Sequence, residues 1–330
     1  MHAREIMRLT RGILSGRRRE ISVRDAWKIV EMPDEETPLL VSCADRIRRE
    51  AKKDRVILCS IINAKSGRCP ENCSFCAQSA HYRTGIESYP LLDPEKMIEE
   101  AGKMQRAGAS RFSFVISGYM PSGTDMKEIC RAARVIREQT PLTVCASLGV
   151  LTPDRAEDLK RAGVGVYHHN LETSRSFFRE VCTTHDYEVD IETVKTAKAA
   201  GLRTCSGGIF GLGESWEHRI ELAFTLRELD VDGIPVNFLN PIPGTPLEGR
   251  PLLSPLEALK CIVLFRFIHP DRNILVCGGR EKILGEFQSW LLPAGANGMM
   301  VGNYLTTPGR DAATDLAMVK ALGLKNELNQ

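Results

Sequence analysis

From about residue 55 onward, short apolar runs alternate with longer amphipathic segments of helical periodicity. This rhythm favours parallel strands joined by crossover helices. Eight strand–helix units predict an α/β fold of the (β/α)8 TIM-barrel type, complete or nearly so. The eight expected strands are residues 56–62, 111–116, 142–148, 164–171, 202–209, 233–239, 273–277 and 298–301.

Helix boundaries are marked by capping residues. Three helices are expected to start where a capping side chain precedes a proline, since proline at the first helical position loses no hydrogen bond. Gly108, Gly163 and Gly201 each follow a helix and supply the left-handed residue that turns the chain back. The three start signals are Asp93-Pro94, Thr152-Pro153 and Ser254-Pro255.

The predicted barrel is flanked by two helical segments and interrupted by no low-complexity linker. We therefore expect one domain, with a helical extension at 1–52, the barrel at 53–307 and a closing helix at 308–330.

Composition narrows the class of protein. A hydrophobic content of 43% and a charged content of 26% are typical of a soluble globular protein, and a formal charge of +2 gives no field suited to nucleic acid or an anionic membrane. No apolar stretch is long enough to span a bilayer, and residues 1–20 are too charged for a signal peptide, which predicts a cytoplasmic protein. In that compartment, 11 cysteines indicate metal ligation rather than disulfides.

The first chemical motif is Cys69-x3-Cys73-x2-Cys76, just beyond the first expected strand. Three thiolates leave one metal position open, whereas a structural zinc or an electron-transfer cluster takes four protein ligands. A partial zinc knuckle or a redox dithiol is the alternative interpretation. The spacing resembles that of the radical S-adenosylmethionine (SAM) superfamily, in which three cysteines hold a 4Fe-4S cluster whose fourth iron binds SAM. Phe75 matches the aromatic residue that packs beside the cofactor in that superfamily.

Four more cysteines lie in alternate strands: Cys59, Cys145, Cys205 and Cys277. Alternate strands of an eight-stranded barrel contribute side chains to the same interior layer, so these thiols are expected to surround a second inorganic centre. The alternative is that each cysteine is a small apolar core residue.

Polar residues also occur where barrel packing alone would favour aliphatic side chains. His168, Asn170 and Glu172 share one face of the fourth strand, and Asn237 lies within an apolar run. We expect Asn170, Glu172 and Asn237 to contact ligands. A buried hydrogen-bond network is the preferred interpretation for His168 or His169 taken singly.

Residues 56–307 resemble the biotin synthase family. The resemblance rests on several motifs beyond the three cysteines: Asn63-Ala64-Lys65-Ser66-Gly67, Ala77-Gln78-Ser79-Ala80, Tyr167-His168-His169-Asn170-Leu171-Glu172-Thr173-Ser174, Cys205-Ser206-Gly207-Gly208, Gly211-Leu212-Gly213-Glu214, Val236-Asn237-Phe238-Leu239, Gly244-Thr245-Pro246-Leu247 and Gly278-Gly279-Arg280-Glu281.

The resemblance implies SAM-dependent sulfur insertion into dethiobiotin to give biotin. A 5′-deoxyadenosyl radical removes two hydrogens from the substrate, and an auxiliary Fe-S cluster deeper in the barrel donates sulfur. An electron donor of flavodoxin or ferredoxin type and a homodimer are implied as well. Asn170 and Glu172 would lie near the SAM ribose and the substrate ureido ring, Asn237 near substrate, Ile209 at the adenine, and Arg111 close to the inner cluster and SAM.

The chain departs from the family pattern at the auxiliary cluster, where three cysteines and one arginine are usual. Ser113 and Leu275 occupy two of those four positions. Cys277, on the same strand face as Leu275, and Cys59 are the expected replacements. Four thiolates suit either 2Fe-2S or 4Fe-4S clusters, and we favour a four-iron auxiliary cluster with an additional, transferable sulfide.

Other departures bear on the first cluster. Asp190 stands where the family commonly carries arginine, which places a salt bridge to SAM in doubt, and Cys182 is a candidate ligand for either cluster. Cys43, Cys130 and Cys261 fall on expected helices and are interpreted as packing residues.

Two kinds of alternative function remain open at this point. One is another radical SAM barrel of the same subgroup, such as a hydrogenase maturase or a methylornithine-forming mutase, since fold does not decide function. The other is a non-enzymatic Fe-S carrier or zinc-binding protein.

Overall fold

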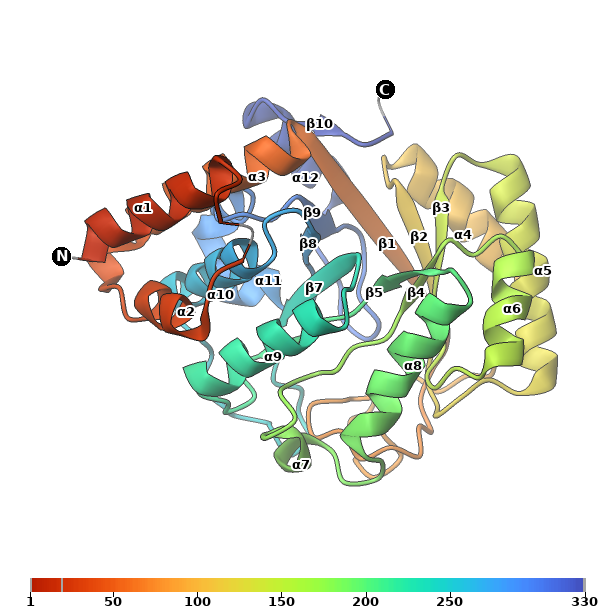
Figure 1. The fold of residues 1–330 in the computed structure, drawn as a ribbon. Helices are drawn as coiled ribbons and strands as arrows, with labels where there is room; N and C mark the ends of the chain where they lie inside the picture. The colour runs from red at the N-terminus through yellow and green to blue at the C-terminus, as the bar shows by residue number, and fades with distance from the viewer. Residues whose placement is uncertain (1, 19, 329–330) are drawn as a thin grey trace.

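The computed structural model describes residues 2–18 and 20–328, so residues 1, 19, 329 and 330 of the predicted terminal segments lie outside it. The described chain forms one ten-stranded sheet wrapped by helices (Figure 1). Its strands are β1 (Arg55–Lys65), β2 (Arg111–Ile116), β3 (Thr143–Ser147), β4 (Val166–His168), β5 (Arg203–Cys205), β6 (Gly208–Phe210), β7 (Gly233–Phe238), β8 (Asn273–Val276), β9 (Gly298–Met300) and β10 (Lys325–Asn326).

The sheet is a closed parallel barrel, as predicted. Strands β1 to β5 pair in sequence, β5 and β6 both pair with β7, and β7, β8 and β9 follow. Closure comes from β9, whose other edge pairs in parallel with β1. Because β5 and β6 together occupy one strand position, the barrel has the eight strand positions of a (β/α)8 fold.

Two predicted strands differ from the observed ones. The fifth is split, because the chain bends at Gly207, where a Cβ atom would lie 2.0 Å from the carbonyl oxygen of Pro235. The fourth ends at His168, since Glu172, further on, has a positive φ of 61° that leaves the extended region. The closing segment also contains a short strand, β10, which pairs with the start of β1.

The outer layer consists of helices that follow the strands. Helices α4, α6 and α10 begin at the expected prolines, although only Ser254 of the three predicted capping side chains accepts a hydrogen bond from its helix. Their bounds are α4 (Pro94–Arg106), α5 (Gly123–Gln139), α6 (Pro153–Arg161), α7 (Phe178–Val181), α8 (Tyr187–Ala199), α9 (Trp216–Glu228), α10 (Pro255–Ile268), α11 (Arg280–Leu284), the 3-10 helix η2 (Gly285–Trp290) and α12 (Ala312–Ala321).

The N-terminal extension is helical, as predicted, and packs against one side of the barrel (Figure 1). It comprises α1 (His2–Leu14), α2 (Val23–Val30), the 3-10 helix η1 (Asp34–Glu36) and α3 (Thr37–Lys52). Both α2 and α3 contact α10. Residues 258–268 of α10 are all buried, because the barrel covers one side of this helix and the extension covers the other. No described helix has the length and apolarity that a membrane span requires.

A fully buried arginine joins α10 to the strands that close the barrel. The guanidinium of Arg266 donates to the backbone carbonyls of Gly295, His269, Pro270 and Arg272 at 2.7 to 3.0 Å. It also donates to Oδ1 of Asn297 at 3.1 Å. One side chain thus satisfies carbonyls of two loops that lack a partner of regular secondary structure.

Replacing this arginine tests how far it stabilises the barrel. Arg266→Met is expected to lower the free energy of unfolding by about 3 kcal/mol or more, because several buried carbonyls lose a charged donor. Thermal unfolding of the full chain measures the change. Arg134→Met, at an exposed position on α5, is the matched control and should change stability by less than about 0.5 kcal/mol. Equal losses of stability in the two variants would contradict the stabilising role of Arg266.

Candidate active site at the carboxyl end of the barrel

A single cavity of about 420 Å³ extends from the loop after β1 into the barrel. It brings together every residue that the sequence assigned to catalysis, cofactor binding or metal ligation. These are Cys59, Cys69, Cys73, Phe75, Cys76, Arg111, Cys145, Asn170, Glu172, Cys205, Ile209, Asn237 and Cys277.

The outer end of the cavity is formed by the loop that carries the three-cysteine motif. The loop folds back on itself, because the N–H of Ala80 donates to the carbonyl of Cys69 at 2.7 Å and the N–H of Cys76 to that of Cys73 at 2.9 Å. It passes beside α7, where the N–H of Ser74 donates to the carbonyl of Val181 at 2.8 Å (Figure 1). Three thiols are thereby presented to one space.

Burial raises the pKa of Cys76 to about 11 and that of Cys69 above its ordinary value. A hydrogen bond with Cys182, together with burial, raises the pKa of Cys73. All three groups therefore favour the neutral thiol until a cation displaces their protons.

The inner end of the cavity is lined by the four strand cysteines. Burial raises the pKa of Cys59 to about 11 and that of Cys205 to about 12, and it raises those of Cys145 and Cys277 as well. The charge of Cys59 adds to the upward shift at each of the other three thiols. The four thiols therefore lie within electrostatic range of Cys59, and all four line the same cavity.

Arg111 lies opposite Cys59 in the pairing of β1 with β2. Its guanidinium offsets part of the upward pKa shift of Cys59, Cys145 and Cys205, so its positive charge lies near this group of thiols. Its Nε is buried without a hydrogen-bond partner, and another nitrogen lies 3.8 Å from the Glu327 carboxylate. Arg111 thus places a buried cation with one unpaired N–H donor near these thiols.

The two ligand positions that depart from the family pattern also line the cavity. Ser113 lies opposite Cys145 in the pairing of β2 with β3. Leu275 belongs to a small buried apolar cluster with Ile57 and Cys277, against which Cys59 packs. Neither side chain is a thiol, the group that usually binds Fe-S clusters.

Polar side chains cover the wall between the two ends. Oδ1 of Asn170 accepts the N–H of Gly207 at 3.2 Å, while its Nδ2 donates to Glu172 at 3.2 Å. Nδ2 of Asn237 donates to the carbonyl of Gly208 at 3.2 Å, and its Oδ1 accepts the N–H of Gly278 at 3.0 Å. Each amide group keeps one N–H and one lone pair for a ligand, and its orientation is fixed by the backbone.

Glu172 is held in the left-handed region, with φ at 61°. Its backbone is fixed there because its carbonyl accepts the N–H of Ile209 at 2.8 Å. Burial raises the pKa of its carboxyl to about 8, and the nearby Asp190 acts in the same direction. Strained backbone and a buried carboxyl both cost stability, and such costs are concentrated at functional sites.

Two further parts of the cavity wall, His168 and the segment 304–307, are not among the site residues predicted from the sequence. Nδ1 of His168 lies 3.0 Å from Oγ of Ser147, which fits the hydrogen-bond network predicted for this histidine. The same side chain also lines the cavity. Burial lowers its pKa to about 4, so it is neutral near pH 7. The segment 304–307 forms part of the rim, and its position after the last barrel strand is the sequence signal that would have identified it.

The rim segment is held by Tyr304. Its hydroxyl donates to the Glu281 carboxylate at 2.7 Å and lies 3.2 Å from the carbonyl of Cys277. From the opposite side, Nδ2 of Asn63 donates to the carbonyl of Leu305 at 2.9 Å. These contacts with Glu281, Cys277 and Asn63 fix the position of the rim segment.

Cys182 contacts Cys73 and therefore lies beside the outer cysteine loop. Asp190 does not face the cavity, because its carboxylate bonds to Nε2 of His169 at 2.8 Å and to Nε2 of His185 at 3.3 Å. Cys43, Cys130 and Cys261 are buried on α3, α5 and α10.

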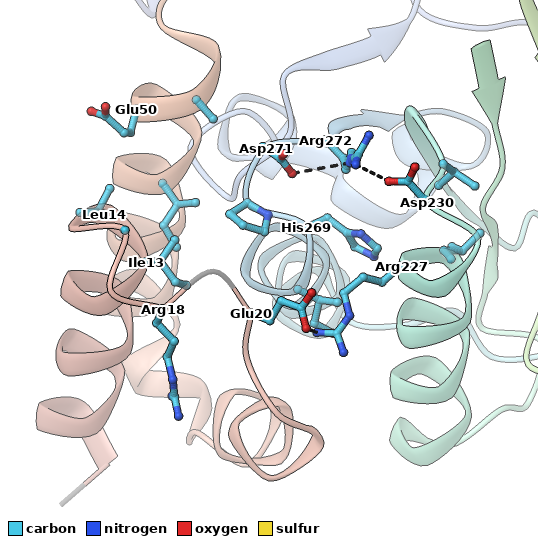
Figure 2. A pocket seen from close by; sticks show the side chains of 17 residues that line it. Ile13, Leu14, Arg18, Glu20, Glu50, Arg227, Asp230, His269, Asp271 and Arg272 are labelled. Carbon is cyan, nitrogen blue, oxygen red and sulfur yellow. Dashed lines mark hydrogen bonds and ion pairs between the residues drawn. The ribbon is translucent and has the colours of Figure 1, made fainter. Parts of the chain in front are cut away.

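A second pocket, of about 530 Å³, lies between the N-terminal extension and the barrel (Figure 2). Its charged groups are engaged with one another: Arg272 pairs with Asp230 and Asp271, and Arg227 lies 3.9 Å from Glu20. None of the predicted site residues lines it.

Comparison with known proteins agrees with the site. Residues 64–226 match the model of the radical SAM superfamily, and residues 235–325 match that of the biotin and thiamin synthesis associated domain. The fold and the three-cysteine loop thus define a radical SAM enzyme, a class that uses a 4Fe-4S cluster and SAM. The junction between the two matches falls between β6 and β7, inside the closed barrel.

Similar proteins of known name identify the family within the radical SAM class. The chain is 57% identical to a biotin synthase of Syntrophus aciditrophicus, covering 95% of this chain and 96% of the relative. It is 55% identical to a biotin synthase of Nitratidesulfovibrio vulgaris strain DP4, covering 92% and 84% respectively. The chain belongs to the biotin synthase family.

Solved structures with the same fold are more distant in sequence. Methylornithine synthase (PylB) has a TM-score of 0.83 at 21% identity, covering 96% of this chain and 97% of its own. The hydrogenase maturase HydG of Carboxydothermus hydrogenoformans has a TM-score of 0.81 at 17% identity, covering 98% and 79%. These likenesses support the radical SAM barrel and do not extend to function.

The strain at Glu172 leads to a prediction about stability and activity together. Glu172→Gly should leave the thermal unfolding midpoint unchanged or raise it, because a left-handed non-glycine residue costs roughly 1 kcal/mol and a buried carboxyl is removed. SAM cleavage should nevertheless fall roughly tenfold or more.

Glu172→Gln serves as the control, since it keeps the side-chain shape without the charge. A clear loss of stability in Glu172→Gly combined with normal SAM cleavage would show that this residue is structural.

Proposed function

We propose that this chain inserts sulfur into dethiobiotin to form biotin, with the reaction confined to the cavity between the outer and inner cysteines. The observation that carries the proposal is the continuity of that cavity, which joins three loop thiols to four strand thiols across a polar wall. When bound, the outer cluster and SAM supply a 5′-deoxyadenosyl radical, and the auxiliary cluster supplies sulfide. The residues of the chain position the reactants and exclude water.

At the outer end, Cys69, Cys73 and Cys76 would hold the 4Fe-4S cluster. Phe75 and Ile209 pack against the same buried apolar cluster, which includes Leu239. This arrangement supports an apolar wall for the SAM adenine, formed by two segments far apart in sequence.

Substrate would lie against the polar wall. A ureido group offers N–H donors and a carbonyl acceptor, which match the amide and carboxyl groups of Asn170, Glu172 and Asn237. The remaining lining is largely apolar and suits an alkyl chain. Because a primary alkyl radical abstracts hydrogen from any nearby C–H bond, this fixed orientation determines which carbons react.

At the inner end, we assign a four-iron auxiliary cluster to Cys59, Cys145, Cys205 and Cys277, with an additional sulfide as the transferred atom. Two features support this assignment: the four thiols line one cavity within electrostatic range of Cys59, and the guanidinium of Arg111 lies near them with an unpaired Nε. Four thiolates would add negative charge, and Arg111 would offset part of it.

Two further proposals follow from the family alone: an electron donor of flavodoxin or ferredoxin type and a homodimer. A cytoplasmic location and a division of the chain into 1–52, 53–307 and 308–330 remain proposals from the sequence pattern.

Metal analysis tests the two-cluster assignment. Anaerobically reconstituted protein should contain about eight irons per chain, because two four-iron clusters are present. Cys277→Ala should retain about four irons and still cleave SAM to 5′-deoxyadenosine without forming biotin. Cys130→Ala, which removes a buried thiol of α5, should behave as the unchanged chain. About six irons per chain would instead indicate a 2Fe-2S auxiliary cluster.

A second test concerns the rim held by Tyr304. Tyr304→Phe removes the hydrogen bond to Glu281 and should raise the ratio of 5′-deoxyadenosine to biotin about twofold or more, because a looser rim admits competing hydrogen donors. The ratio is measured by chromatography after anaerobic incubation with dethiobiotin, SAM and reductant. Tyr187→Phe is the matched control, since Tyr187 is a buried tyrosine of α8 away from the cavity. An unchanged ratio in Tyr304→Phe would remove the rim from the mechanism.

A further inference from the structure

A group of metal-ligating side chains lies outside the cavity, where the outer cysteine loop meets the segment after α7. Glu71 comes from the loop, and Cys182 and His185 come from the segment. One ligand atom from each residue lies within 4.8 Å of the other two. None of the three residues lines the cavity.

One of the three distances among these atoms already matches a zinc coordination sphere, and the other two bracket it. Sγ of Cys182 lies 3.4 Å from Nδ1 of His185 and 4.0 Å from a carboxylate oxygen of Glu71, and that oxygen lies 2.5 Å from the same nitrogen. Tetrahedral zinc with bonds of about 2.0 to 2.3 Å separates such ligand atoms by about 3.2 to 3.7 Å. Side-chain shifts of about an ångström or less would convert one arrangement into the other.

The surrounding residues orient these groups as in a metal site. Metal-bound histidines usually donate their second ring N–H to a carboxylate, which fixes the ring and its tautomer. Nε2 of His185 lies 3.3 Å from an oxygen of Asp190. Oδ1 of Asn72 lies 3.5 Å from Sγ of Cys182 but already accepts the N–H of Thr183 at 2.9 Å, so the fourth position is left to water.

Charge and burial also favour a cation here. Cys182 is 2% exposed, and the side chains of Glu71 and Asp190 are 14% and 6% exposed. The partly buried Glu71 carboxylate and the Cys182 thiol thus lie around the His185 imidazole, while Asp190 also bonds to His169. Buried charge is costly unless it is balanced.

Arg175 and Arg179, which precede Cys182 on the chain, are engaged with other carboxylates. Arg175 pairs with Glu188, and Arg179 pairs with Asp186. Cys73, the thiol that contacts Cys182, is assigned to the outer cluster. Once Cys73 holds iron, the Cys182 sulfur is left with Glu71 and His185 as its ligating neighbours.

We propose that Glu71, Cys182 and His185 bind one zinc ion, with water as the fourth ligand. Thiolate, imidazole and carboxylate are the donors that zinc prefers. The ion would clamp the outer cysteine loop to the segment 182–190, which leads into α8. The site does not depend on which substrate the cavity takes.

Zinc analysis of the holoenzyme tests this site. Protein with both Fe-S clusters reconstituted is dialysed against buffered Zn²⁺ and should retain about one zinc per chain without losing iron. Zinc K-edge absorption should show one sulfur at about 2.3 Å and two or three nitrogen or oxygen neighbours. Cys182→Ser and Glu71→Gln should each lower the zinc content at least about tenfold, and Cys130→Ser should not.

Several outcomes would overturn the proposal. These are no retained zinc, an equal zinc content in wild type and Cys182→Ser, or a shell of several sulfur atoms with iron lost from the protein. The last result would place zinc at the three-cysteine motif. The absorption spectrum of the unchanged holoenzyme decides the question even if a variant fails to fold.

Discussion

The pairing of β9 with β1 is the constraint on which the rest of the structure depends. It closes the parallel sheet, so side chains that point inward from separate strands must share one interior. An open sheet with the same sequence would leave Cys59 near one edge and Cys277 near the other. In the closed barrel the two thiols belong to the same buried surroundings. The sulfur-rich inner end of the cavity is therefore a consequence of closure.

Closure of the barrel also explains why the outer cysteines lie closer to the carboxyl ends of the strands than the inner ones. The loop after β1 leaves from the carboxyl ends of the strands, the end at which barrel enzymes place their chemistry. The wall between the two groups is formed where strands stop being regular, at Gly207 and Glu172, and by Asn237 near the end of β7. Backbone groups freed at these points fix the asparagine side chains. Irregularity at the strand ends thus positions the polar groups that a substrate would contact.

The sequence predicted the features that depend on local periodicity. The alternation of strands and helices, the helix starts at proline and the inward direction of Cys59, Cys145, Cys205 and Cys277 all follow from spacing along the chain. The break between β5 and β6 could not be predicted, because it arises from a contact between Gly207 and Pro235 on another strand. The anchoring of Tyr304 by Glu281 likewise depends on a tertiary contact, between residues 23 positions apart. The cluster of Glu71 with Cys182 joins two loops separated by 111 positions, and no local pattern marks such a contact.

The central claim is that the four inner thiols hold the cluster that gives up sulfur. The most direct measurement is a single turnover by protein whose Fe-S clusters have been rebuilt with ³⁴S-sulfide, followed by mass spectrometry of the biotin formed. The account predicts that the first equivalent of biotin carries ³⁴S while the outer cluster keeps its iron and sulfide. Biotin containing only unlabelled sulfur would contradict it.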